Sequence, residues 1–387
     1  MAEYIKNIRK SFKLKHYVNY IVIALFLIIT SSMMYSGTLN RSTANLITQI
    51  AYSIILAVSL NLVVGFLGEL SLGHAGFMCL GAYIGCFAAK QMHAFIASPL
   101  LILVISMLIG GLVAAVFGFI IGLPALRLKG DYLAIVTLAF GEIVRTVFKN
   151  LKTFGGALGL STKKYPTDLF VIALIAVIIM LILVQNLVRS KHGRAITAIR
   201  DNEIAAKAMG INVTFYKLFV FVVSAFFAGI AGVIYGHFTT PVLYSFFSYN
   251  YSIEILVMVV LGGMGSINGS IIAATLITYI NFQLTTRLSG DLAALKFLIY
   301  ALILITIVIF NNAPALKPFK ERFSLKRTKA KNQKALGEEK IKKQQSSIKD
   351  DSAQWNRIPT KIDMDAILTV DVANESGAKK EEGGDEE

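Results

Sequence analysis

Charged residues are scarce in this sequence. Asp, Glu, Lys and Arg make up only 16% of its 387 residues, whereas soluble domains usually carry about 25%. Hydrophobic residues make up 55%, and the mean hydropathy is +0.65. Apolar runs long enough to cross a hydrocarbon core of about 30 Å recur along the chain, most plainly at residues 18–34, 99–122, 169–188 and 295–310. The composition therefore predicts an integral membrane protein that crosses the bilayer several times.

Reactive residues and their motifs are also few. Cys79 and Cys86 are the only cysteines, and their spacing favours packing on one helix face over a disulfide or a metal site. The five histidines show no metal-ligand spacing, and the sequence contains neither an HExxH nor a GxSxG motif. No glycine is followed by lysine, which excludes a Walker A loop. We therefore expect no metal, no cofactor and no enzyme activity in this chain, and any ATP that drives it must be bound by another chain.

The net charge of +15 does not indicate a nucleic-acid partner, because Lys and Arg of a membrane protein gather in its cytoplasmic loops. We expect an all-α fold with ten membrane segments, at about residues 18–35, 44–64, 73–89, 99–122, 131–148, 169–188, 217–237, 252–264, 268–284 and 295–312. Residues 1–16 form a basic N-terminus and residues 17–312 the transmembrane domain. An even number of spans then places both termini and the polar loop at 189–216 in the cytoplasm. The charged tail at 313–387 is expected to be disordered.

Two stretches are unlike ordinary membrane spans. GFLGELSLGHAG at residues 65–76 and LGGMGSINGS at residues 261–270 interrupt apolar regions with glycines and polar side chains. Glycines break helices, and irregular backbone at membrane depth is tolerated only where protein or a watery cavity surrounds it. One break in each half of the chain indicates a transport pathway. Tight helix packing through small residues is an equally good interpretation, and the two are compatible.

Acidic residues within the expected spans are candidates for function, because an ionisable group in a membrane is costly. The alternative is that each acid lies in water at a membrane edge. Asp131, at the start of a segment, is interpreted as a helix cap. The candidates for the translocation pathway are Glu69, Ser71, Gly73, His74, Glu142, Glu254, Gly263, Gly265 and Ser266.

The polar loop at residues 189–216 predicts two short helices. The first runs over about residues 194–200. Asp201 is expected to cap the second, with Glu203 in its first turn and Gly210 as its stop. Small residues at 205, 206 and 208, followed by Met209, predict a nearly smooth surface between charges, which suits a short helix lying in a groove of a soluble partner. A solvated loop is the alternative.

Four long motifs resemble those of one transporter family. They are NLVVGFLGELSLGHAGF at 61–77, LPALRLKGDYLAIVTLAFGEIVR at 123–145, GRAITAIRDNEIAAKAMGI at 193–211 and SIEILVMVVLGGMGSING at 252–269. In this order they resemble the LivM-type permease subunits of ATP-binding-cassette importers for branched-chain amino acids. The resemblance covers roughly residues 45–312. The charged tail departs from the family, whose members usually end soon after the last span.

The resemblance implies a set of partners in a bacterial inner membrane. These are a second, homologous permease, two cytoplasmic ATPases that bind the ATP, and an extracytoplasmic ligand-binding protein. The loop would be the segment that couples the ATPases to the membrane helices. The coupling residues that the resemblance implies are Gly193, Arg194, Arg200, Asp201, Glu203, Ala205, Ala206, Met209 and Gly210.

Three other functions stay open on the sequence alone. Related permeases that import urea, short amides or nucleosides share these motifs. An ion-coupled secondary transporter would need buried acidic ion sites and no ATPase-docking loop, and this chain shows the reverse balance. A membrane enzyme is disfavoured, because no catalytic constellation is present.

Overall fold

The computed structural model describes residues 40–128, 130–162, 169–287, 301, 302 and 305. Within them the chain is helical and forms no β-strand. The predicted segment at 18–35 and nearly all of the one at 295–312 lie outside the described residues, as do the basic N-terminus at 1–16 and the charged tail at 313–387.

Each of the eight other predicted segments coincides with one helix. The main helices are α3 (Arg41–Asn61), α4 (His74–Met92), α5 (Pro99–Ala125), α6 (Asp131–Asn150), α7 (Leu169–Arg189), α8 (Lys191–Asp201), α9 (Glu203–Ala208), α10 (Val213–Phe238), α11 (Tyr249–Gly262) and α12 (Ile267–Arg287). Short turns of other helix types are η2 (Leu62–Leu67), η3 (Lys152–Phe154), η4 (Gly156–Leu158) and η5 (Tyr244–Phe247). Among the described residues, five helices are long and apolar enough to cross a membrane: α3 with η2, α5, α7, α10 and α12.

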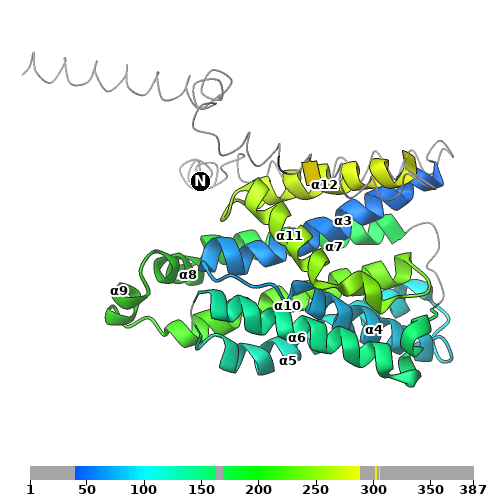
Figure 1. Ribbon diagram of the computed structural model, residues 1–387, viewed down its shortest axis with the longest axis horizontal. Helices are drawn as coiled ribbons and strands as arrows, with labels where there is room; N and C mark the ends of the chain where they lie inside the picture. The colour runs from blue at the N-terminus through cyan, green and yellow to red at the C-terminus, as the bar shows by residue number, and fades with distance from the viewer. Residues whose placement is uncertain (1–39, 129, 163–168, 288–300, 303–304, 306–387) are drawn as a thin grey trace, which may run out of the picture. The chain divides into compact units, whose positions relative to one another are not determined.

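Helices α3 and α10 form the centre of the described bundle. From Ala51 to Leu67 every residue of α3 and η2 is buried. Helix α3 contacts α7, α10, α11 and α12, and α10 also packs against α4 and α5. Figure 1 shows these helices lying alongside one another, with α8 and α9 together at one end. We call this end of the bundle the loop end.

Close glycine contacts join α4, α5 and α10. Gly81 of α4 lies against the backbone of Gly229, and a Cβ atom added at Gly110 would lie 2.5 Å from Val233 Cγ2. Small residues allow helix backbones to approach in this way. Cys79 and Cys86 are buried in the same region of α4 and are not bonded to each other, as packing on one face predicts.

Two non-helical turns of the chain lie between consecutive helices. The first turn, residues 68–73, separates η2 from α4, and the second turn, residues 263–266, separates α11 from α12. Gly263 has φ +89°, a conformation that only glycine adopts without strain, and it ends α11. Helix α11 has 14 residues, so it is about 21 Å long and shorter than a hydrocarbon core of about 30 Å.

The start of α6 corrects one prediction. The helix begins at Asp131, but Gly130 occupies the N-cap position and no side chain caps the helix. Asp131 instead lies in the first turn, where its carboxylate interacts favourably with the helix dipole. The predicted capping role is therefore wrong, because the helix starts at Asp131 itself, one residue earlier than a capping aspartate at this position requires.

Candidate functional site

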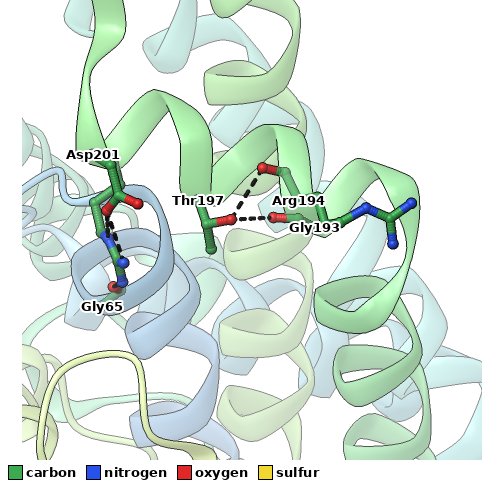
Figure 2. Close-up of polar contacts among 6 residues, drawn as sticks. Gly65, Gly193, Arg194, Thr197 and Asp201 are labelled. Carbon is green, nitrogen blue, oxygen red and sulfur yellow. Dashed lines mark hydrogen bonds and ion pairs between the residues drawn. The ribbon is translucent and has the colours of Figure 1, made fainter. Parts of the chain in front are cut away.

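The first helix of the polar loop begins earlier than predicted. Ser190 is the N-cap of α8, and its Oγ accepts hydrogen bonds from the backbone N–H groups of His192, at 3.1 Å, and Gly193, at 3.3 Å. Gly193 packs against the backbone at the end of α7 and leaves no room for a Cβ atom. Thr197 then donates to the carbonyl oxygens of Gly193 and Arg194 inside α8 (Figure 2). The loop therefore turns sharply out of α7 and starts α8 at residue 191.

The second helix of the loop is capped by Asn202. Its Oδ1 accepts a hydrogen bond from Ala205 N–H at 3.0 Å. Asn202 is the extended residue between the two helices, so its side chain meets the free N–H groups of α9. Asp201 is the last residue of α8 and instead accepts hydrogen bonds from Arg200 at 2.9 and 3.0 Å, so the predicted cap is wrong by one residue. Gly210, at φ +79°, ends the segment as predicted.

The exposed face of α9 also differs from the prediction. Ala206 is only 4% exposed and packs against its own chain, so it is not on the surface that was expected to meet a partner. Ile204 and Met209 are 81% and 83% exposed, and Ala205 lies beside them. Ile204 was missed, although an isoleucine among small and charged residues of a short polar helix is a usable signal. We call Ile204, Ala205 and Met209 the docking face.

Arg200 connects α8 to η2 and lies close to both non-helical turns. Its Nη1 donates a hydrogen bond to the carbonyl oxygen of Gly65 at 3.1 Å (Figure 2). A Cβ atom added at Gly68 would lie 2.8 Å from Arg200 Cγ, and one added at Gly265 would lie 3.4 Å from its Nη1. The side chain of Arg194 points away from Gly65 in the same view. Of these two predicted arginines, only Arg200 reaches the turns.

A buried lysine forms a second connection. Lys217 Nζ lies 2.5 Å from Glu69 Oε1 of the first turn and 3.1 Å from Glu203 Oε2 of α9. The lysine side chain is 5% exposed and that of Glu69 14%. The two carboxylates compensate the charge of the buried ammonium. Removing the ammonium, or both carboxylates, would leave a buried charge without its partner and would destabilise the fold. The sequence indicated Glu69 and Glu203, but it did not single out Lys217 as a candidate.

Asn61, the last residue of α3, joins this helix to the second turn and to α12. Its Oδ1 accepts a hydrogen bond from Gly265 N–H at 2.9 Å. Its Nδ2 donates to Ser270 Oγ at 2.9 Å and to the carbonyl oxygen of Ser266 at 3.2 Å. Asn61 is fully buried, so its amide is committed to these partners. The second turn is therefore fastened to the end of α3, from which it is 204 residues apart in sequence, and Arg200 of α8 lies close to both turns.

The remaining candidates in the first turn and at the start of α4 lie in the protein interior. His74 Nε2 lies 2.9 Å from Ser59 Oγ, and both residues are buried. Ser71 is 2% exposed. Gly73 packs against the backbone of Thr137 so closely that a Cβ atom would collide with its carbonyl oxygen. These positions are sites of tight packing.

Glu142 and Glu254 occupy two other places. Glu142 pairs with Arg145 at 2.8 Å and accepts a hydrogen bond from Tyr249 N–H at 3.0 Å, so it supports the start of α11. Glu254, on α11, lines a cavity of about 350 Å³ between α3, α10, α11 and α12. Its Oε1 accepts a hydrogen bond from Asn281 Nδ2 at 3.1 Å. The structure thus brings Glu69, Gly265 and Ser266 to the loop end beside the polar loop and places Glu254 in a separate cavity.

Comparisons with known proteins identify the family of this chain. Residues 42–308 match the family described as the permease component of branched-chain amino acid transport systems. The chain is 32% identical to the high-affinity branched-chain amino acid transport system permease protein LivM of Salmonella typhimurium, over 80% of this chain and 78% of that protein. It is 33% identical to LivM of Escherichia coli, over 76% of this chain and 75% of the relative.

A more distant relative carries a different solute in its name. The chain is 26% identical to the ribose import permease protein RbsC of Haemophilus influenzae, over 61% of this chain and 75% of that protein. No solved structure matches the chain significantly. The family match covers more than half of the chain and includes the polar loop, both turns and the cavity. The chain therefore belongs to the family of permease components of branched-chain amino acid transport systems.

Proposed function

We propose that this chain is the transmembrane permease subunit of an ATP-binding-cassette importer for branched-chain amino acids. It would pair with a second, homologous permease in a bacterial inner membrane, with both termini in the cytoplasm. Two cytoplasmic ATPases would bind ATP and dock at the loop end, and an extracytoplasmic binding protein would deliver the solute. The names of the LivM relatives support the solute class.

The observation that carries this proposal is the ion pair of Lys217 with Glu69 and Glu203. Motion of α9 would reach the first turn directly, because the lysine holds both carboxylates in one buried cluster. Arg200 would pass motion of α8 to Gly65 in the same way. The loop thus forms a short mechanical link between a soluble partner and the two turns.

The turns are the proposed movable part of the translocation path. They interrupt the helices beside the centre of the bundle, and the Asn61 amide ties the end of α3 to the second turn. A change at the loop end would therefore act on α3, α11 and α12 together, which supports a rocking movement between outward and inward access. The chain's own role is mechanical.

The test is uptake by the reconstituted complex of both permeases and both ATPases, with its binding protein. We expect radiolabelled L-leucine to accumulate only when ATP is present on the side of the membrane where the ATPases lie. Accumulation should persist when ion gradients are collapsed. Uptake driven by an ion gradient without ATP would establish a secondary transporter instead. Uptake of ribose, urea or a nucleoside but not of leucine would support the importer function and show that its solute is a different one.

A further inference from the structure

Two chemically different groups of side chains line the cavity beside Glu254. One group, which we call the aromatic wall, consists of aromatic rings from α3, α10, η5 and α11. Tyr52 and Tyr235 meet edge to face with centroids 5.7 Å apart, Tyr235 stacks on Phe246 at 4.2 Å, and Phe246 packs on Tyr251 at 4.5 Å. Such a wall offers apolar surface to an aliphatic group, and the faces of its rings attract cations.

The other group of lining residues is polar. It includes Glu254 of α11 and Thr278 and Asn281 of α12. Asn281 donates a hydrogen bond to the Glu254 carboxylate and so fixes one of its oxygen atoms. Among the described residues that line the cavity there is one acidic side chain and no Lys, Arg or His. A cavity lined in this way attracts a cationic group and disfavours an isolated anion.

Thr278 adds an independent sign that a ligand binds here. Its side chain is buried, with 7% exposure, and its Oγ1 has no hydrogen-bond partner among the described residues. Buried hydroxyl groups in proteins are almost always hydrogen-bonded, so one that is left over beside a cavity marks a place for a polar group of a ligand. The hydroxyl belongs to the same polar group of lining residues as Glu254.

We propose that this cavity is a solute site in which Glu254 binds an ammonium group and the aromatic wall receives a small aliphatic side chain. The Thr278 hydroxyl binds the carboxylate of the same solute. The volume of about 350 Å³ suits a small molecule. This proposal rests on the proposed function and deepens it, because it places recognition of the amino group in the permease as well as in the binding protein.

The first test measures binding to the purified permease–ATPase complex without its binding protein. The probes are isoamylamine, L-leucine and isocaproate, which share a branched alkyl end and differ in their charged groups. We expect the amine and leucine to raise the melting temperature and isocaproate to leave it unchanged, because a ligand of the native state stabilises it. An equal or larger shift with isocaproate would overturn the proposal.

Two variants test the two polar contacts. Glu254→Gln keeps an oxygen atom for Asn281 but removes the charge, and it should raise the half-saturating concentration of isoamylamine by about tenfold or more. Thr278→Val keeps the side-chain shape, and it should weaken the response to leucine severalfold and leave that to isoamylamine unchanged. Asp131→Asn, which removes an exposed carboxylate at the start of α6, is the control. If Glu254→Gln responds to isoamylamine as the parent does, the contact of Glu254 with the ammonium group is refuted. If Thr278→Val responds to leucine as the parent does, the contact of Thr278 with the carboxylate is refuted.

The second test separates this proposal from the proposed function. In the reconstituted complex with its binding protein, Glu254→Gln should keep stimulated ATP hydrolysis and lose about nine tenths or more of leucine uptake. If the parent complex takes up no leucine, the proposed function fails. If the parent takes up leucine and Glu254→Gln does so equally well, the proposed function stands and the solute site is wrong.

Discussion

Lys217 of α10 and Glu69 of the first turn form an ion pair whose nitrogen and oxygen atoms lie 2.5 Å apart, with both side chains largely buried. The same nitrogen lies 3.1 Å from Glu203 of α9. One ammonium group therefore holds a membrane helix, a turn and the polar loop in contact.

We expect Lys217→Met to destabilise the permease by about 3 kcal/mol, because it leaves the Glu69 carboxylate buried without its partner. Glu69→Gln in the same chain should restore part of this loss. The measurement is thermal unfolding of both single variants and the double variant in detergent. Additive effects of the two changes, with no coupling energy, would show that the pair contributes nothing specific.

Arg200→Gln should reduce leucine uptake about tenfold while the chain still assembles with the second permease. The variant loses the hydrogen bond to the Gly65 carbonyl oxygen, a contact from a charged donor that contributes about 1.5–3 kcal/mol. Lys191→Gln, also an exposed charge change on α8, is the matched control. Equal uptake by both variants would show that the contact with the Gly65 carbonyl of η2 transmits nothing.

Ile204→Asp and Met209→Asp should each prevent co-purification of the ATPases, because a charge replaces an exposed apolar contact of the docking face. Leu158→Asp is the matched control, since Leu158 is 86% exposed in η4, outside the polar loop. Ala206→Trp should behave differently and lower the melting temperature, because it overpacks a buried position. Retention of the ATPases by both docking-face variants would exclude this surface as their site.

The polar loop and the Leu158 region should face opposite sides of the membrane. Single cysteines at Lys191 and Leu158 would react with an impermeant maleimide from opposite sides, in intact cells and in inverted vesicles. The native Cys79 and Cys86 are buried and should contribute little background. Reaction of both introduced cysteines from the same side would contradict an odd number of spans between residues 158 and 191.

The helices of the described region follow from local sequence signals, whereas the contacts at its loop end do not. Hydropathy located α3, α7 and α10, and Gly210 marked the end of the loop helices, because such signals act within a few residues. Asn61 and Gly265 are 204 residues apart in sequence. No periodicity in a single sequence indicates that their side chain and backbone meet.

Two errors inside the loop come from its short elements. Helix α9 has six residues, which is less than two turns and too few for a sequence pattern to define which face is buried. Ala205 and Ala206 were therefore assigned to one surface, although only Ala206 is buried. The boundary between α8 and α9 is a single extended residue, and Asp201 and Asn202 are both good capping residues.

The anchoring of α8 and α9 has a consequence for the speed of assembly. Ser190 and Asn202 cap the two helices, and Arg200 and Glu203 fasten them to the rest of the chain. Ile204 and Met209 are thus presented on an ordered surface of the chain alone. In the proposed importer, docking of the ATPases would need no coupled folding of the loop, so its association rate should be set by diffusion and orientation, and dissociation should respond most strongly to changes in the apolar contacts.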